Sequence, residues 1–176
     1  MDVNDLISVA VQLFNEKKYA EAIEKLHQAW DGITDKSTQI REQIEIQSGF
    51  GRCYFEQAMK AKDTDETDKL FGKAVEHYQE RLRFAKQLTD EQGSVQQQIN
   101  AQSWLGGCYL EQAIKAKGKG KESEQLFGQA VEHHQQQLSL AKQLEDKQNS
   151  LQEQIDALNM LLIIRYFRVC DQQEIK

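Results

Sequence analysis

The sequence predicts an all-α fold, a solenoid of antiparallel helical hairpins, and three observations support this prediction. Residues 94–117 repeat residues 39–62 at an offset of 55, and residues 126–144 repeat residues 70–88 at an offset of 56. A partial third copy begins at Ser150. Every long segment has apolar residues at helical spacing, and the chain has no proline to interrupt a helix. Internal repetition of this length is typical of solenoids, whose units bury their apolar faces only by stacking.

The apolar periodicity predicts about seven helices. We expect them at residues 3–16, 19–33, 38–62, 66–90, 94–117, 122–146 and 150–170. Paired along the chain, they form hairpins over 3–33, 38–90 and 94–146, followed by a terminal helix over 150–170. We expect a single domain that covers residues 1–176.

Local signals mark several of the expected helix ends. Ser94 and Ser150 are each followed, three residues later, by the glutamine or glutamate of a capping box. Gly93 is placed where a helix C-terminus favours a left-handed residue. Asp63 is expected to cap the helix that follows it. Glycines at positions 118 and 120 predict the break between the fifth and sixth helices.

Charge and apolar content bound the possible functions. The 176-residue chain carries a formal net charge of −6, which disfavours a general binder of nucleic-acid phosphates. Its longest apolar run, residues 160–164, is far shorter than the roughly 20 residues that a membrane span needs. The N-terminus is acidic and lacks the basic region and cleavage site of a signal peptide. We therefore expect a cytoplasmic protein that binds neither nucleic acid nor membranes.

One segment departs from this acidic character. Residues 115–121 read KAKGKGK, whereas the corresponding residues 60–69 of the preceding copy read KAKDTDETDK. Three interpretations stay open: complementary charges on neighbouring hairpins, an acidic partner, or nucleic acid. The first is favoured, because it needs nothing beyond the repeats themselves, although each exposed pair contributes only about 0.2–1 kcal/mol.

The first hairpin resembles a tetratricopeptide repeat. Residues 4–33, NDLISVAVQLFNEKKYAEAIEKLHQAWDGI, have apolar or small residues at the family's signature positions. These residues are Leu6, Val9, Ala10 and Leu13 on the first helix and Tyr19, Ala22, Leu26 and Ala29 on the second. Thr34 replaces the closing proline of the family. Residues 48–144 resemble the longer repeats of adaptor proteins, with helices that exceed those of the usual unit by about ten residues each.

The resemblance implies a right-handed superhelix, a TPR-like α-solenoid, in which the first helix of each hairpin lines a concave surface. Members of the family usually bind peptides or helices of other proteins there. The resemblance also implies that Gly51 and Gly106 lie where paired helices cross closely. Cys53 and Cys108 share one repeat position, and we expect both to be buried among apolar side chains.

Positions on the first helices that point away from the partner helix predict what this surface binds. Many are apolar, which indicates an amphipathic helix or a hydrophobic peptide as the ligand. The predicted partner-binding residues are Val11, Phe14, Ser48, Arg52, Phe55, Ser103, Leu110 and Asn159. Only Arg52 and Asn159 suit the family's clamp for acidic peptide C-termini, so that activity is disfavoured. The alternative is that long neighbouring helices simply cover these side chains.

Residues with catalytic or metal-binding chemistry are too scattered to predict an active site. The three cysteines are too far apart for a zinc knuckle. Only Glu24 and His27 have the Glu-x-x-His spacing that a helical di-iron centre needs twice. The chain has no phosphate-binding loop, nucleophile elbow or HExxH motif. We expect no enzyme activity, no metal and no cofactor.

The sequence therefore predicts a non-catalytic adaptor that binds a protein or peptide on its concave surface. A self-assembling structural subunit and the sensing segment of a larger regulator are the alternatives. The segment MLLIIRYFRVC is apolar nearly all round, which predicts self-association through Leu161, Ile164 and Phe167. A two-fold homodimer is favoured there over a partner protein or further repeats.

Overall fold

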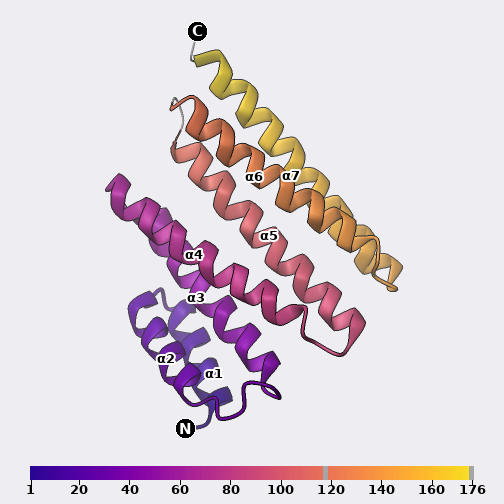
Figure 1. Ribbon diagram of the computed structural model, residues 1–176. Coiled ribbons are helices and arrows are strands. Elements are labelled where there is room, and N and C mark those ends of the chain that lie inside the picture. Colours follow the sequence, from indigo (N-terminus) through magenta and orange to yellow (C-terminus); the bar gives the residue numbers. More distant parts are fainter. Residues whose placement is uncertain (117–118, 175–176) are drawn as a thin grey trace. The chain divides into compact units, whose positions relative to one another are not determined.

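The computed structural model describes residues 1–116 and 119–174, with side chains up to residue 171. The described residues form seven helices and no strand, which confirms the all-α prediction (Figure 1). The helices are α1 (Val3–Asn15), α2 (Tyr19–Asp31), α3 (Ile40–Lys60), α4 (Thr64–Ala85), α5 (Glu91–Lys115), α6 (Lys121–Ala141) and α7 (Lys147–Glu174). Lys117 of the predicted basic segment and the helix-breaking Gly118 lie outside the described residues.

The chain divides into two compact units. The N-terminal unit, Met1–Leu88, contains α1 to α4, and the C-terminal unit, Thr89–Lys176, contains α5 to α7. The single domain and the right-handed superhelix expected from the sequence concern the arrangement of these two units, and both stay predictions.

In the N-terminal unit, two helical hairpins pack on each other (Figure 1). The turn between α1 and α2 covers residues 16–18, and Lys17 in this turn has a left-handed φ of 62°. The first hairpin packs on α3 through buried apolar side chains, namely Leu6, Ile7, Ala10, Ala22, Leu26, Ala29, Ile46, Phe50 and Cys53. A second cluster joins α3 to α4, and there Trp30 of α2 lies 6.1 Å from Phe84 between ring centroids.

In the C-terminal unit, α6 contacts both α5 and α7 (Figure 1). Its core combines side chains of all three helices, namely Leu110, Ala113, Phe127, Ala130 and Ile164. Near the start of α6, the hydroxyl of Ser123 donates to Oδ2 of Asp171 at 2.6 Å, and Glu124 forms an ion pair with Arg168. These polar contacts fix the C-terminal part of α7 on α6.

Both predicted glycine crossings are confirmed. A Cβ placed on Gly51 would lie 2.7 Å from two ring carbons of Tyr78 on α4. A Cβ placed on Gly106 would lie 2.5 Å from Nε2 of His134 on α6. Atoms that close overlap, so in each unit a glycine of the first helix makes room for a ring of the second.

Two helices end earlier than predicted, because loop residues continue the apolar period. α4 ends at Ala85 and α6 at Ala141, each five residues before the predicted ends at 90 and 146. Leu88 and Leu144 follow these ends, yet they still pack on the cores of their units. Apolar periodicity alone does not distinguish a helical turn from a loop that folds back onto the core.

The capping aspartates explain where the later helices begin. Asp63 caps α4 as predicted, because its Oδ1 accepts a hydrogen bond from a first-turn N–H at 2.9 Å. Asp146 does the same for α7, accepting from the N–H of Asn149 at 2.8 Å. Ser150 was predicted to cap α7, but its hydroxyl donates to the carbonyl of Ala141 at 2.7 Å. This serine therefore satisfies a carbonyl at the C-terminal end of α6. α7 begins at Lys147, three residues earlier than predicted.

The predicted capping roles of Gly93 and Ser94 are also wrong. Both residues lie inside α5, which begins at Glu91. Gly120 fulfils its predicted role as a helix break, since it precedes α6 with a φ of 61°, a left-handed value that favours glycine.

Candidate functional site

A shallow hollow lies between α1 and α3 of the N-terminal unit, and we call it the α1–α3 groove. Its volume is about 30 Å³. It is lined by Ile7, Ala10, Val11 and Phe14 of α1, Leu26 of α2, and Glu45, Gly49, Arg52 and Cys53 of α3. Two of these nine residues are charged, six have apolar side chains, and the ninth is a glycine. The site is therefore an apolar surface with charges at its edge.

The floor of the α1–α3 groove is tightly packed. Ala10 and Leu26 are 3% and 2% exposed, and a Cβ on Gly49 would lie 2.9 Å from the methyl carbons of Leu26. The glycine thus lets the leucine side chain reach α3. Burial raises the pKa of Cys53 to about 11, so its thiol stays neutral and behaves as a small apolar group. Cys108 is buried as well, as predicted for both cysteines, and burial raises its pKa to about 12.

The rim of the α1–α3 groove offers apolar surface and two charges. The side chain of Val11 is 47% exposed. The guanidinium of Arg52 lies over the Phe14 ring, 4.3 Å from its centroid, and this cation–π contact holds both side chains. Phe14 also packs on Tyr19 at 5.4 Å between centroids. Glu45 is exposed two helical turns before Arg52, so the groove has an acidic and a basic end about 10 Å apart.

The structure brings together three of the predicted partner-binding residues. The three that line the α1–α3 groove are Val11, Phe14 and Arg52. Ser48 is half-buried on α3 and does not line it. The ring of Phe55 meets that of Phe71 on α4 edge-on, at 5.7 Å between centroids. The prediction that Phe55 points away from its partner helix is therefore wrong.

The predicted partner-binding residues of the C-terminal unit differ from one another in burial. Leu110 is 4% exposed and packs in the core with Phe127 and Ile164. Its predicted place on a binding surface is wrong, because α6 and α7 both contribute side chains that cover it. Ser103 is half-buried and Asn159 is exposed. A concave surface shared by the two units stays a prediction.

Sequence reasoning missed Glu45 and Gly49. A signal for the glycine was present, because the second copy has Trp104 at this repeat position. The second copy also has Gly107 in place of Arg52. Of the α3 residues that line the groove, the second copy thus retains only the cysteine, as Cys108, and changes Glu45, Gly49 and Arg52.

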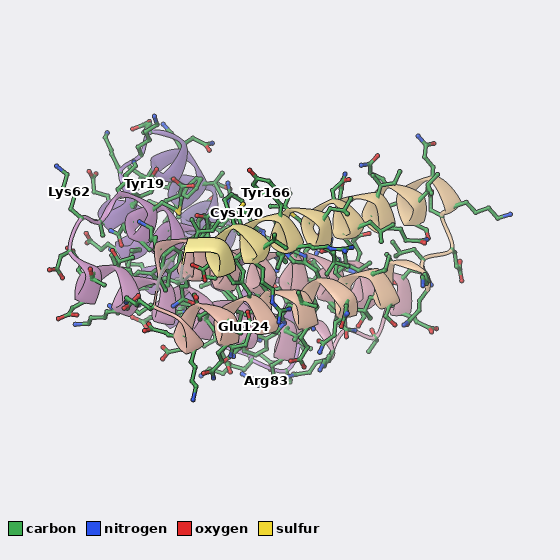
Figure 2. All side chains as sticks on the ribbon, turned by 90° about the horizontal axis from the view of Figure 1, so that it is seen from above. Tyr19, Lys62, Arg83, Glu124, Tyr166 and Cys170 are labelled. Carbon is green, nitrogen blue, oxygen red and sulfur yellow. The ribbon has the colours of Figure 1, made fainter. Side chains whose placement is uncertain are left out.

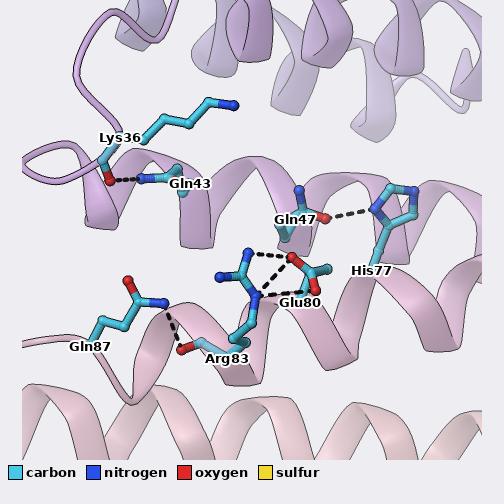
Figure 3. Close-up of polar contacts among 7 residues, drawn as sticks. All are labelled: Lys36, Gln43, Gln47, His77, Glu80, Arg83 and Gln87. Carbon is cyan, nitrogen blue, oxygen red and sulfur yellow. Dashed lines mark hydrogen bonds and ion pairs between the residues drawn. The ribbon is translucent and has the colours of Figure 1, made fainter.

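A cluster of glutamine, histidine and tyrosine links α3 to α4. Nδ1 of His77 lies 2.7 Å from Oε1 of Gln47 (Figure 3), and since the amide oxygen only accepts, Nδ1 donates. The imidazole also stacks on Tyr54, at 5.5 Å between centroids and 6° between planes. Burial lowers the pKa of His77 to about 4, so the ring is neutral at pH 7.

The C-terminal unit repeats this cluster between α5 and α6. Nδ1 of His133 lies 2.7 Å from Oε1 of Gln102, and the ring stacks on Tyr109 at 5.4 Å. Burial lowers the pKa of His133 as well. Because the same neutral, hydrogen-bonded histidine occurs in both units, its contacts are those of a structural link between paired helices.

The predicted self-association residues of α7 face their own unit. Ile164 is 0% exposed, and Phe167 packs against the same core. Leu161 is half-buried. The assignment of Ile164 to an interface is wrong, because α5 and α6 already cover it. The sequence misplaced the surface because α7 is apolar on two opposite sides, and periodicity does not tell which side the fold covers.

Over residues 1–116 and 119–174, no helix has both the length and the apolar content to cross a lipid bilayer. In the same part of the chain, no three His, Cys, Asp or Glu side chains gather where they would hold a metal ion.

No known protein-family model matches this chain, and no curated protein matches it. The tetratricopeptide resemblance therefore rests on the sequence pattern and stays a prediction.

Proposed function

We propose that the chain is a non-catalytic interaction module, and that its α1–α3 groove receives an apolar side chain of a partner protein or peptide. The observation that carries this proposal is the rim, where an exposed valine lies beside a phenylalanine held by Arg52. Exposed apolar side chains next to a packed hollow are typical of interaction sites.

The size of the groove sets the kind of ligand. Sites for small molecules and cofactors usually enclose about 300–1,000 Å³, whereas this hollow holds about 30 Å³. One apolar side chain of an amphipathic helix or hydrophobic peptide fits such a depression as an anchor. The charges at its ends favour a ligand with a basic residue toward Glu45 and an acidic residue toward Arg52.

The finer predictions from the sequence belong to the same proposal. We propose that the hairpins of both units form one TPR-like array, which is supported by the repeated glycine crossings and the repeated Gln–His–Tyr clusters. The contacts of His77 and His133 support a module without catalysis, because the Nδ1 atom of each ring is engaged in a hydrogen bond with a glutamine amide. A cytoplasmic location and a sensing role within a larger regulator stay predictions. A self-assembling subunit is the second candidate function, and the exposed apolar side of α7 favours it.

A peptide library tests the groove assignment. Helical peptides displayed on phage would be selected on the purified protein, and their affinities measured by fluorescence anisotropy. Val11→Glu places a charge at the apolar rim, so we expect at least a tenfold loss in affinity, about 1.4 kcal/mol. The matched control is Ser8→Glu, because Ser8 is exposed on the same helix but does not line the groove.

The control should bind the selected peptides as the unchanged chain does, and both variants should keep their helical circular dichroism. Equal affinity of Val11→Glu and Ser8→Glu for every selected peptide would contradict the assignment. Loss of binding only with a variant of α7 would place the ligand on that helix instead.

A further inference from the structure

One side of α7 is apolar and exposed. It lies opposite the side that carries the fully buried Ala157 and Ile164. We call it the outer α7 face, and it consists of Leu151, Ile155, Leu158, Leu162, Tyr166 and Val169, which are 42–66% exposed. Tyr166 is the most exposed of these and points away from the body of the C-terminal unit (Figure 2). Exposed patches of this extent usually mark an interface.

The internal repeat shows what kind of element belongs on this face. At the repeat offset of 56, the outer α7 face corresponds to Val95, Ile99, Gln102, Gly106, Leu110 and Ala113 of α5. All six are buried. Four of them belong to apolar clusters that include α6 residues, Gln102 is hydrogen-bonded to Gln136 and His133 of α6, and His134 covers the glycine. By this correspondence, the outer α7 face matches the first-helix face of a hairpin, and among the described residues no second helix lies on it.

A helix that packs on this face would differ from α4 and α6. Those helices each place a ring, Tyr78 or His134, against a glycine of the first helix. In α7 the corresponding residue is Leu162. Its side chain occupies the space that such a ring would need, so a helix on this face must pack through interdigitating side chains at a wider spacing.

The spacing along the outer α7 face fits a second copy of the same helix. Leu151, Ile155, Leu158 and Leu162 are separated by four, three and four residues, and Val169 follows one heptad later. This is the a/d pattern by which two helices, including two copies of one helix, pack knobs into holes. Arg165 occupies the remaining seam position and is exposed. A parallel pair would place the two arginines face to face, whereas an antiparallel pair separates them.

The exposed area approaches what a dimer needs. The six residues expose on the order of 600–700 Å², most of the roughly 800 Å² per partner that a stable specific interface buries. We propose that α7 pairs antiparallel with α7 of a second copy about a two-fold axis, so that each helix completes the unfinished hairpin of the other. An isologous pair of this kind covers both apolar faces at once.

Light scattering after size exclusion tests the proposal. At about 100 µM we expect twice the chain mass of 20.3 kDa. Leu162→Glu should give a monomer with unchanged helical circular dichroism, because Leu162 is 64% exposed. Gln135→Glu, on an exposed position of α6, adds the same charge elsewhere in the unit and should stay dimeric. Val11→Glu should also stay dimeric, which separates this test from that of the α1–α3 groove.

The orientation has its own test. In chains that carry Cys170→Ser, so that the accessible native thiol of α7 is removed, Ile155→Cys and Tyr166→Cys mixed under oxidising conditions should cross-link mainly to each other, because antiparallel pairing centred on the seam brings these positions together. A monomer at about 100 µM overturns the proposal and leaves a helix of another protein, or a further repeat of a longer chain, as the occupant. A dimer that survives Leu162→Glu, or cross-links only between identical positions, overturns it as well.

Discussion

Two adjacent glycines of α5 allow the helix crossing to be tested with a matched pair of variants. A Cβ on Gly106 would lie 2.5, 2.7 and 2.8 Å from three ring atoms of His134 on α6. A Cβ on Gly107 would meet nothing within 4 Å. Replacing either residue by alanine changes the chain in the same way, so any difference in stability reports the contact with α6.

The magnitude follows from two opposing contributions. Alanine stabilises a helix interior relative to glycine by about 0.5–1 kcal/mol, and Gly107→Ala should gain this amount. The ring of His134 has no room to move, because it is 0% exposed and its Nδ1 is hydrogen-bonded to Gln137 at 2.9 Å. Overpacking at such a site costs about 1–3 kcal/mol. We therefore expect Gly106→Ala to be about 1–3 kcal/mol less stable than Gly107→Ala.

Urea unfolding followed by helical circular dichroism measures this difference, provided that both variants unfold with the same dependence on urea. Adding His134→Ala should remove the penalty of Gly106→Ala, which a double-mutant cycle would show as a favourable coupling. If the two alanine variants were equally stable, α5 and α6 would not cross closely at Gly106, and the repeated glycine would not be a packing requirement.

Two further predictions concern titration and thiol chemistry. The pKa of His77 is lowered by burial to about 4, whereas an unfolded imidazole titrates near 6.5. Between these two pH values the unfolded chain binds more protons than the folded chain. The free energy of unfolding should therefore fall by on the order of 2 kcal/mol as the pH drops from 7 to 4.5. His77→Asn should show a smaller loss in the same unfolding measurement, and an identical pH profile would contradict the assignment. Cys53 and Cys108 are buried and Cys170 is partly exposed, so a thiol reagent at pH 8 should label one cysteine in the native chain and three in denaturant. Rapid labelling of all three without denaturant would mean that the cores open readily.

The glycine crossings were predictable because the two copies retain them. Gly51 and Gly106 occupy one repeat position, whereas Arg52 beside the first has become Gly107 in the second copy. A small residue retained among changed neighbours indicates a packing requirement, and the short distances to Tyr78 and His134 confirm it. Periodicity also located all seven helices, since each has apolar side chains on the face that its unit covers.

The groove and the exposed apolar side of α7 were less accessible to sequence reasoning. Val11 and Arg52 are far apart in the chain, and only the packing of α1 on α3 brings them to one hollow. Ile164 and Leu162 are both apolar and only two residues apart, yet one is 0% and the other 64% exposed. The choice between them depends on where α6 lies, and this is a tertiary property that helical periodicity does not contain.

The division into two units has an optical consequence. The chain has two tryptophans, and each unit contains one of them, Trp30 in the first and Trp104 in the second. Trp104→Phe leaves a fluorophore that reports only on the N-terminal unit, and Trp30→Phe leaves one that reports only on the C-terminal unit. The emission of each variant then records the melting of a single unit. If both variants melt at the same temperature, the two units unfold together as one cooperative unit. If they melt at different temperatures, the two units unfold independently.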